Sequence, residues 1–154
     1  MLVIIGLFIS FNFIVMPYSC PVCTEDPSSH SLSKLLETDD LVYFYTCPAK
    51  ATKYADREGI LAHYDGVLRE KGDKPWTWIF DCDGFEMRHA MEVSLAIDMA
   101  RLISDTHGNT LVQVCVINPT WHIHITINVI WPFLSRHIRS IIVFDSNNQF
   151  ALTG

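Results

Sequence analysis

The sequence lacks every short motif that would mark a catalytic or nucleotide-binding site. It contains no H-E-x-x-H, no G-x-S-x-G, no P-loop and no G-x-G-x-x-G, the patterns typical of metalloproteases, hydrolases and nucleotide-binding proteins. Two nearby acids, Asp81 and Asp83, are better explained by a turn at Asp83-Gly84 that caps the next helix. We therefore expect a protein that is not an enzyme.

Positive charge is also scarce. The 154 residues include 11 Lys and Arg against 17 Asp and Glu, which gives a formal net charge of −6. Nucleic-acid binding needs a basic face, so we expect no nucleic-acid partner. Hydrophobic residues make up 49% and charged residues 18%, a composition typical of one globular domain large enough to bury a core.

The N-terminal segment contains no Lys or Arg, because the first one in the chain is Lys34. Residues 1–16 are nearly all apolar, yet a membrane-spanning helix needs about 20 such residues and a secretory signal begins with positive charge. Two interpretations remain, a membrane anchor or an upstream start that is not functional, with translation from Met16. We accordingly expect a cytoplasmic or membrane-associated protein.

Cysteine spacing gives no sign of a disulfide scaffold. The five cysteines are an odd number, which favours a reducing compartment. Two of them form C-P-V-C at Cys20 and Cys23, which can be half of a zinc site or a redox pair. Its place in a polar loop before the first strand disfavours the redox pair, and for zinc the sequence has no second C-x-x-C. The expected further ligands are Cys47 and His30, and without bound zinc these cysteines would be free thiols.

Regular structure is predicted after a polar loop over residues 17–40. Stretches rich in aromatic and β-branched residues predict strands, and apolar residues at helical spacing predict helices over 55–70 and 86–105. The strands are expected at residues 41–46, 76–80, 111–117 and 140–144. Strands that alternate with helices of this length predict an α/β fold with a mainly parallel sheet and crossover helices.

One segment, residues 121–131, has two competing patterns. Apolar residues alternate along it with period 2, which favours a strand. Ile123, Ile127, Ile130 and Leu134 also fall at helical spacing. A parallel sheet needs a crossover between the strands at 111–117 and 140–144, so we predict a helix.

These segments in their order resemble the CRAL-TRIO lipid-binding domain, the family of phosphatidylinositol- and tocopherol-transfer proteins. The resemblance is carried by a strand that ends at Asp81, a later strand that closes in Asn118-Pro119, and a bulky apolar helix followed by W-P-F-L-S, basic residues and another strand. It covers about residues 41–145. The resemblance implies a CRAL-TRIO-like fold, shortened because the sequence leaves no room for the family's flanking helices.

The resemblance also implies a binding site for a lipid or another apolar small molecule. In the family, the helix after Asn-Pro is a mobile gate over a pocket whose floor is the sheet, so residues 121–134 are the expected gate. A phosphate head group would be bound near the end of this gate, and loading would involve transient contact with a membrane surface. The expected site residues are Trp121, Ile123, Ile127, Ile130, Trp131, Leu134, Arg136 and Arg139.

An alternative is a small zinc-stabilised or purely structural interaction protein that keeps this fold and has lost the pocket. The same isoleucines would then be packed core. The sequence therefore divides into an apolar leader (1–16), a polar loop with the C-x-x-C (17–40), the α/β domain (41–145) and a polar tail (146–154).

Overall fold

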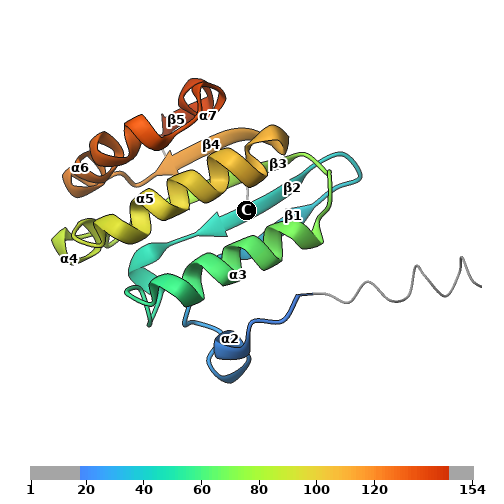
Figure 1. Ribbon diagram of the computed structural model, residues 1–154, viewed down its shortest axis with the longest axis horizontal. Helices are drawn as coiled ribbons and strands as arrows, with labels where there is room; N and C mark the ends of the chain where they lie inside the picture. The colour runs from blue at the N-terminus through green and yellow to red at the C-terminus, as the bar shows by residue number, and fades with distance from the viewer. Residues whose placement is uncertain (1–17, 146–154) are drawn as a thin grey trace, which may run out of the picture.

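The computed structural model describes residues 18–145. The predictions for the apolar leader, for Met16 and for the polar tail lie outside these residues. Within the described part, the strands form one five-stranded sheet in the order β1-β2-β3-β4-β5 (Figure 1). The strands are β1 (Ser33–Glu37), β2 (Val42–Thr46), β3 (Trp76–Asp81), β4 (Leu111–Ile117) and β5 (Ile142–Asp145).

The predicted mainly parallel sheet is confirmed. The pairs β2–β3, β3–β4 and β4–β5 are parallel, and among the strands of residues 18–145 only β1 runs antiparallel to its neighbour. Each parallel pair is joined by a helical crossover, as that geometry requires. The crossovers contain α3 (Arg57–Glu70), α5 (Val93–Leu102), and α6 (Trp121–Ile130) with α7 (Arg136–Ile141).

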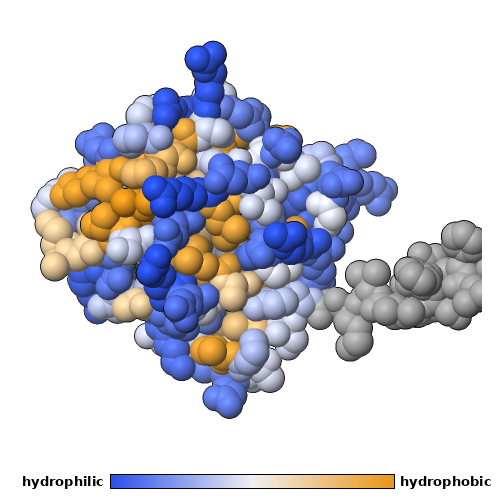
Figure 2. Space-filling model, in the orientation of Figure 1, coloured by the Kyte–Doolittle hydropathy of each residue, from blue (hydrophilic) through white to orange (hydrophobic). Residues whose placement is uncertain are grey.

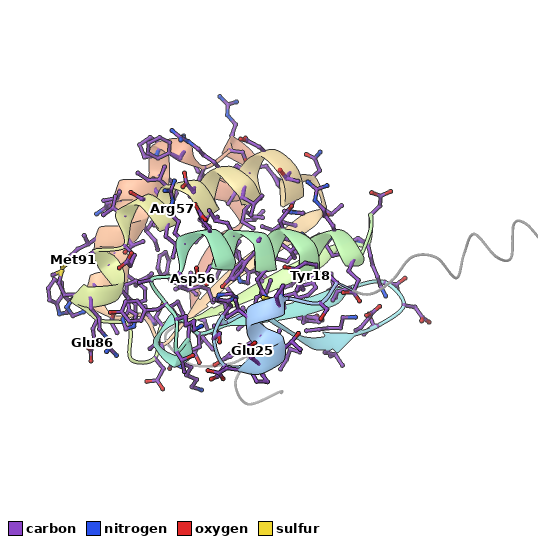
Figure 3. All side chains as sticks on the ribbon, turned by 60° about the horizontal axis from the view of Figure 1, so that its bottom comes forward. Tyr18, Glu25, Asp56, Arg57, Glu86 and Met91 are labelled. Atoms are coloured by element: carbon purple, nitrogen blue, oxygen red, sulfur yellow. The ribbon has the colours of Figure 1, made fainter. Side chains whose placement is uncertain are left out.

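The four crossover helices pack on the same face of the sheet. Trp78 of β3 lies beneath residues of α3 and α5, and Val114 of β4 lies beneath residues of α6 and α7. The ion pair between Arg57 and Asp98 joins α3 to α5 (Figure 3 labels Arg57). The largest fully buried side chains between these layers are Trp76, Phe44, Leu68, Ile103 and Leu111.

The segment 121–131 is helical, as the topological argument predicted. The ten residues of α6 run from Trp121 to Ile130, despite the run of β-branched residues that favours a strand. Its ends are close to those expected, and Trp131–Phe133 continues it as a short 3-10 turn. The tertiary requirement for a crossover outweighs the local preference here.

Three parts of the sequence-based prediction were wrong in detail. The expected loop over residues 17–40 contains a short helix, α2 (Pro21–Glu25), and the edge strand β1. The expected helix over 86–105 is divided into α4 (Met87–Ala90) and α5 and ends in a wide turn at Ile103–His107. The last strand begins at Ile142, because the residues before it form α7.

Among residues 18–145, none of the helices has the length and apolar character needed to cross a membrane.

Candidate functional site

Two apolar hollows lie between the sheet and the helices. The first, here called the α3 hollow, has a volume of about 110 Å³ and is walled by α3, α5, β3, the segment before β1 and the segment after β2. The second, the α6 hollow, has a volume of about 130 Å³ and is walled by α5, α6, α7, β3 and β4. Both are bordered by Trp78, Phe80, Ala96, Met99 and Thr126.

The α6 hollow contains four of the residues expected to line a pocket. Ile123, Ile127, Ile130 and Leu134 form its α6 side, and Ile123 and Leu134 are buried. The opposite side is formed by Val114 and Val116 of β4 and by Ile103, Ile138 and Ile142. An apolar wall on both sides suits hydrocarbon, because burying each methylene stabilises a complex by about 0.8 kcal/mol.

The two tryptophans lie outside the hollow. Trp121 at the start of α6 is 63% exposed and Trp131 just beyond its end is 40% exposed, and Ile125 between them is 38% exposed. These residues give α6 an apolar outer face in addition to its apolar inner face. Figure 2 shows hydrophobic atoms gathered on one side of the molecule over α6 and the neighbouring part of α5.

Neither expected arginine contacts the hollows. Arg136 is exposed on α7. Arg139 donates hydrogen bonds from Nε to the carbonyl oxygen of Trp131 (3.1 Å) and from a terminal nitrogen to that of Pro132 (3.5 Å). Its guanidinium also lies over the Trp131 ring, 5.8 Å from the centroid. Arg139 therefore fixes the turn that follows α6.

The α3 hollow contains polar groups that sequence reasoning missed. His89 Nδ1 accepts a hydrogen bond from the backbone of Glu86 (3.0 Å), so Nε2 carries the proton in the neutral ring. Burial, and secondarily the charge of Arg88, lowers the pKa of His89, which favours that neutral ring. Within the described residues, His89 Nε2 and Thr126 Oγ1 are buried without a hydrogen-bond partner.

Another polar side chain at this hollow, Tyr64, has hydrogen-bond partners within the protein. The Tyr64 hydroxyl donates to the carbonyl oxygen of Ser31 (2.6 Å) and lies 3.3 Å from Thr46 Oγ1, and burial raises its pKa. Trp78 Nε1 donates to the same Thr46 oxygen (2.9 Å). These bonds fix the floor between α3 and the sheet, whereas His89 Nε2 and Thr126 Oγ1 have no partner among the described residues.

The acids at the end of β3 stabilise the local structure through hydrogen bonds and a turn. Asp81 accepts hydrogen bonds from the Tyr45 hydroxyl, from Asn118 Nδ2 (2.9 Å) and from the backbone of Asp83 (3.0 Å). Burial raises the pKa of Asp81, but these bonds outweigh it and the net pKa is lowered. The expected turn is present, with Gly84 at φ 79°, but Glu86 and not Asp83 caps the following helix.

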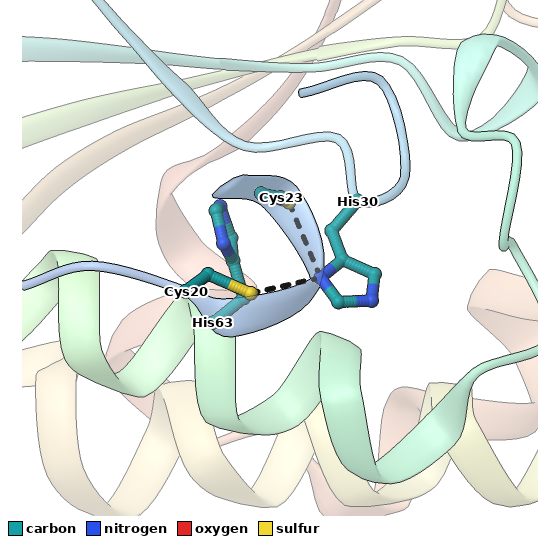
Figure 4. A group of neighbouring side chains, drawn as sticks. All are labelled: Cys20, Cys23, His30 and His63. Atoms are coloured by element: carbon teal, nitrogen blue, oxygen red, sulfur yellow. Dashed lines mark hydrogen bonds between the residues drawn. The ribbon is translucent and has the colours of Figure 1, made fainter. Parts of the chain in front are cut away.

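The expected metal ligands are only partly brought together. Cys20, Cys23 and His30 lie in one group with His63 of α3, and the four ligand atoms are within 4.8 Å of one another (Figure 4). Cys47 lies elsewhere, with its thiol 3.6 Å from the carbonyl oxygen of Asp83. Sequence reasoning missed His63 because it is far along the chain from the C-x-x-C and matches no motif.

Comparison with known proteins decides the family. A family model described as the CRAL/TRIO domain matches residues 25–153. The chain belongs to the CRAL/TRIO family. Proteins of this family bind lipids or other apolar small molecules and are generally not enzymes. The match begins within residues 17–40, the segment that was predicted to be a loop.

The fold agrees with a solved structure of low sequence identity. The structure entitled "Crystal structure of Sfh5" superposes with a TM-score of 0.59 at 14% identity, over 79% of this chain and 50% of that one. The present chain thus spans about half the length of that protein, and the likeness concerns the fold. No curated protein sequence matches.

Proposed function

We propose that this CRAL/TRIO chain is a non-enzymatic module that binds a lipid or similar apolar molecule between the sheet and α6. The observation that supports it best is the α6 hollow, which is apolar on the helix side and on the sheet side. Residues 121–134 would form the gate over this space. The exposed tryptophans at the two ends of α6 would stay outside the bound ligand.

The sizes of the hollows favour a movable gate. A cavity of about 150 Å³ lined by apolar side chains takes a molecule the size of benzene, so each hollow of about 110 or 130 Å³ suits one ring or a short chain. Sites for larger ligands reach about 300–1,000 Å³. A long acyl chain would therefore occupy both hollows and require α6 to move outward.

Polar recognition would occur at two places. Inside, His89 Nε2 donates to a carbonyl or carboxylate oxygen of the ligand, and the Thr126 hydroxyl lies at the border of both hollows. Outside, a phosphate head group would be bound by Arg136 or Arg139 at the end of the gate. The buried pair selects a ligand with a polar oxygen, since an unpaired buried donor costs about 1–3 kcal/mol.

Loading would take place at a membrane surface. Trp121, Ile125 and Trp131 are exposed on or beside α6, and tryptophan is enriched at membrane interfaces because it combines an apolar ring with an N–H donor. A contact through this outer face would place the gate next to the lipids that it admits. The contact would be transient, because these three side chains offer a small area.

The test uses purified protein, mass spectrometry of any extracted ligand, and titration with a fluorescent fatty acyl probe. Ala96→Phe places a ring at the border of both hollows, whereas Ser94→Phe places the same ring on the exposed side of α5. We expect Ala96→Phe to lower probe affinity at least about tenfold and Ser94→Phe to leave it unchanged. A wild-type protein that binds no probe and carries no lipid would support the alternative of a structural interaction protein.

A further inference from the structure

A group of four sulfur and nitrogen ligands lies on the outer side of α3. Cys20 is the N-cap of α2, Cys23 lies within that helix, His30 follows it, and His63 projects from α3. Their side chains converge on one space (Figure 4). Cys20, His30 and His63 are buried and Cys23 is half-buried. The group therefore forms a closed site made by two chain segments that are distant in sequence.

The distances from His30 to the two sulfur atoms suit a tetrahedral ion. The Nδ1 atom of His30 lies 3.6 Å from Cys20 Sγ and 3.5 Å from Cys23 Sγ. A tetrahedral zinc ion with bonds of about 2.3 Å to sulfur and about 2.0–2.1 Å to nitrogen separates its ligands by about 3.3–3.8 Å. Two thiolates and two imidazoles are the ligand set that selects zinc.

Both histidines are oriented by a second hydrogen bond. His30 Nε2 lies 2.8 Å from Asp56 Oδ2, and a carboxylate accepts, so Nε2 carries the proton and Nδ1 keeps its lone pair. Asp56 is at the start of α3, on the side that faces α2 (Figure 3). This carboxylate–histidine pair is the outer-shell arrangement of metal-binding histidines.

His63 is held in the same way. Its Nε2 lies 3.0 Å from the carbonyl oxygen of Leu32, and a carbonyl only accepts, so the proton is again on Nε2. Its Nδ1 is buried and has no hydrogen-bond partner within the described residues. An orphaned buried acceptor costs free energy, and in this position a metal ion would be its partner.

We propose that Cys20, Cys23, His30 and His63 bind one Zn²⁺ ion, with Asp56 and the Leu32 carbonyl as outer-shell partners. All four positions of the tetrahedron are taken by protein, so the site is structural rather than catalytic. The ion fixes residues 20–32 to α3. Ser31 and Tyr64, each next in sequence to a ligand, border the α3 hollow, so zinc holds one wall of that hollow.

The first experiment measures metal in the full-length protein, purified under reducing conditions from zinc-supplemented cells. We expect about one zinc per chain, and we expect Co²⁺ exchanged into the protein to give the visible absorption of a tetrahedral thiolate site. Removal of the metal with a chelator should lower the melting temperature, and added zinc should restore it. Wild-type protein with no stoichiometric zinc, or a Cys20–Cys23 disulfide under these conditions, would overturn the proposal.

The second experiment uses variants to assign the ligands. His63→Gln and Cys23→Ser should lose the zinc, and the matched controls His124→Gln and Cys47→Ser should retain it. Asp56→Asn keeps a side chain that caps helices equally well but removes the carboxylate, so we expect zinc affinity to fall about 10–100-fold in a folded protein. Retention of wild-type zinc affinity by His63→Gln would contradict the assignment, and none of these readouts depends on lipid binding.

Discussion

The substitution Ile127→Asp distinguishes between two interpretations of α6, a movable gate helix and a helix fixed in the core. Ile127 is half-buried and faces the α6 hollow. Loss of its apolar contacts costs about 0.8–1.5 kcal/mol, half the value for full burial. If α6 can swing outward, the carboxylate stays hydrated and adds little to this loss of stability. If α6 is fixed, the buried charge adds several kcal/mol, a large share of a total stability of about 5–15 kcal/mol.

We expect the outcome of a movable helix. The melting temperature of Ile127→Asp should fall by about 2–6 °C, at about 2–4 °C per kcal/mol for a chain of this size. Binding of a fluorescent fatty acyl probe should fall by at least about tenfold, because the charge lines the site. Thermal unfolding followed by circular dichroism and a probe titration measure the two quantities on the same sample.

The matched control is Ile125→Asp, two residues earlier on the exposed face of α6. An exposed substitution changes stability by about 0.5 kcal/mol or less, so both readouts should stay close to wild type. The reasoning is refuted if Ile127→Asp unfolds the domain while Ile125→Asp does not, since α6 would then be core. It is equally refuted if Ile127→Asp binds the probe as tightly as the wild type.

Two further predictions concern the outer face of α6 and the end of β3. Trp121→Ala should reduce cosedimentation with phospholipid vesicles and leave the melting temperature and probe binding unchanged; unchanged cosedimentation would exclude this face as the membrane contact. Asp81→Asn should cost about 1.5–3 kcal/mol at pH 7, because hydrogen bonds to a charged group are lost. The folded-state pKa of Asp81 lies below its ordinary value of 3.8, so its stabilisation is present above about pH 3.8 and is lost as the pH falls through the folded-state value. In denaturant unfolding, the difference between wild type and variant should shrink from pH 7 to pH 3, and a constant difference would contradict this origin.

The central strands could be predicted because their composition and burial agree. Aromatic and β-branched residues fill β2, β3 and β4, and most of their side chains are buried. The edge strand β1 could not, because all five residues of S-K-L-L-E are exposed and no alternation of burial marks them. The short helix α7 was hidden because its last residue, Ile141, begins the apolar run that was read as strand.

The candidate site was accessible to sequence reasoning only in part. Helical spacing identifies the side of α6 that carries Ile123 and Ile127, but Ala96 and Met99 join it only through the packing of α5 on the sheet. His63 lies 33 residues after His30 and matches no motif, so only the placement of α3 beside α2 brings it to the C-x-x-C. Cys47 is nearer in sequence, and its backbone N–H donates to Ser31 Oγ (2.7 Å), next to His30. Its thiol nevertheless lies beside the carbonyl oxygen of Asp83 and outside the group.

Met99 is one of the side chains that separate the α3 hollow from the α6 hollow. Methionine is unbranched and has three rotatable bonds, so it adapts to irregular spaces at little cost. A compact ring would fit on one side of this partition and leave it unchanged, whereas a linear chain would need the Met99 side chain to rotate aside. The range of ligand shapes that the site accepts would thus depend in part on one flexible thioether, in addition to the position of α6.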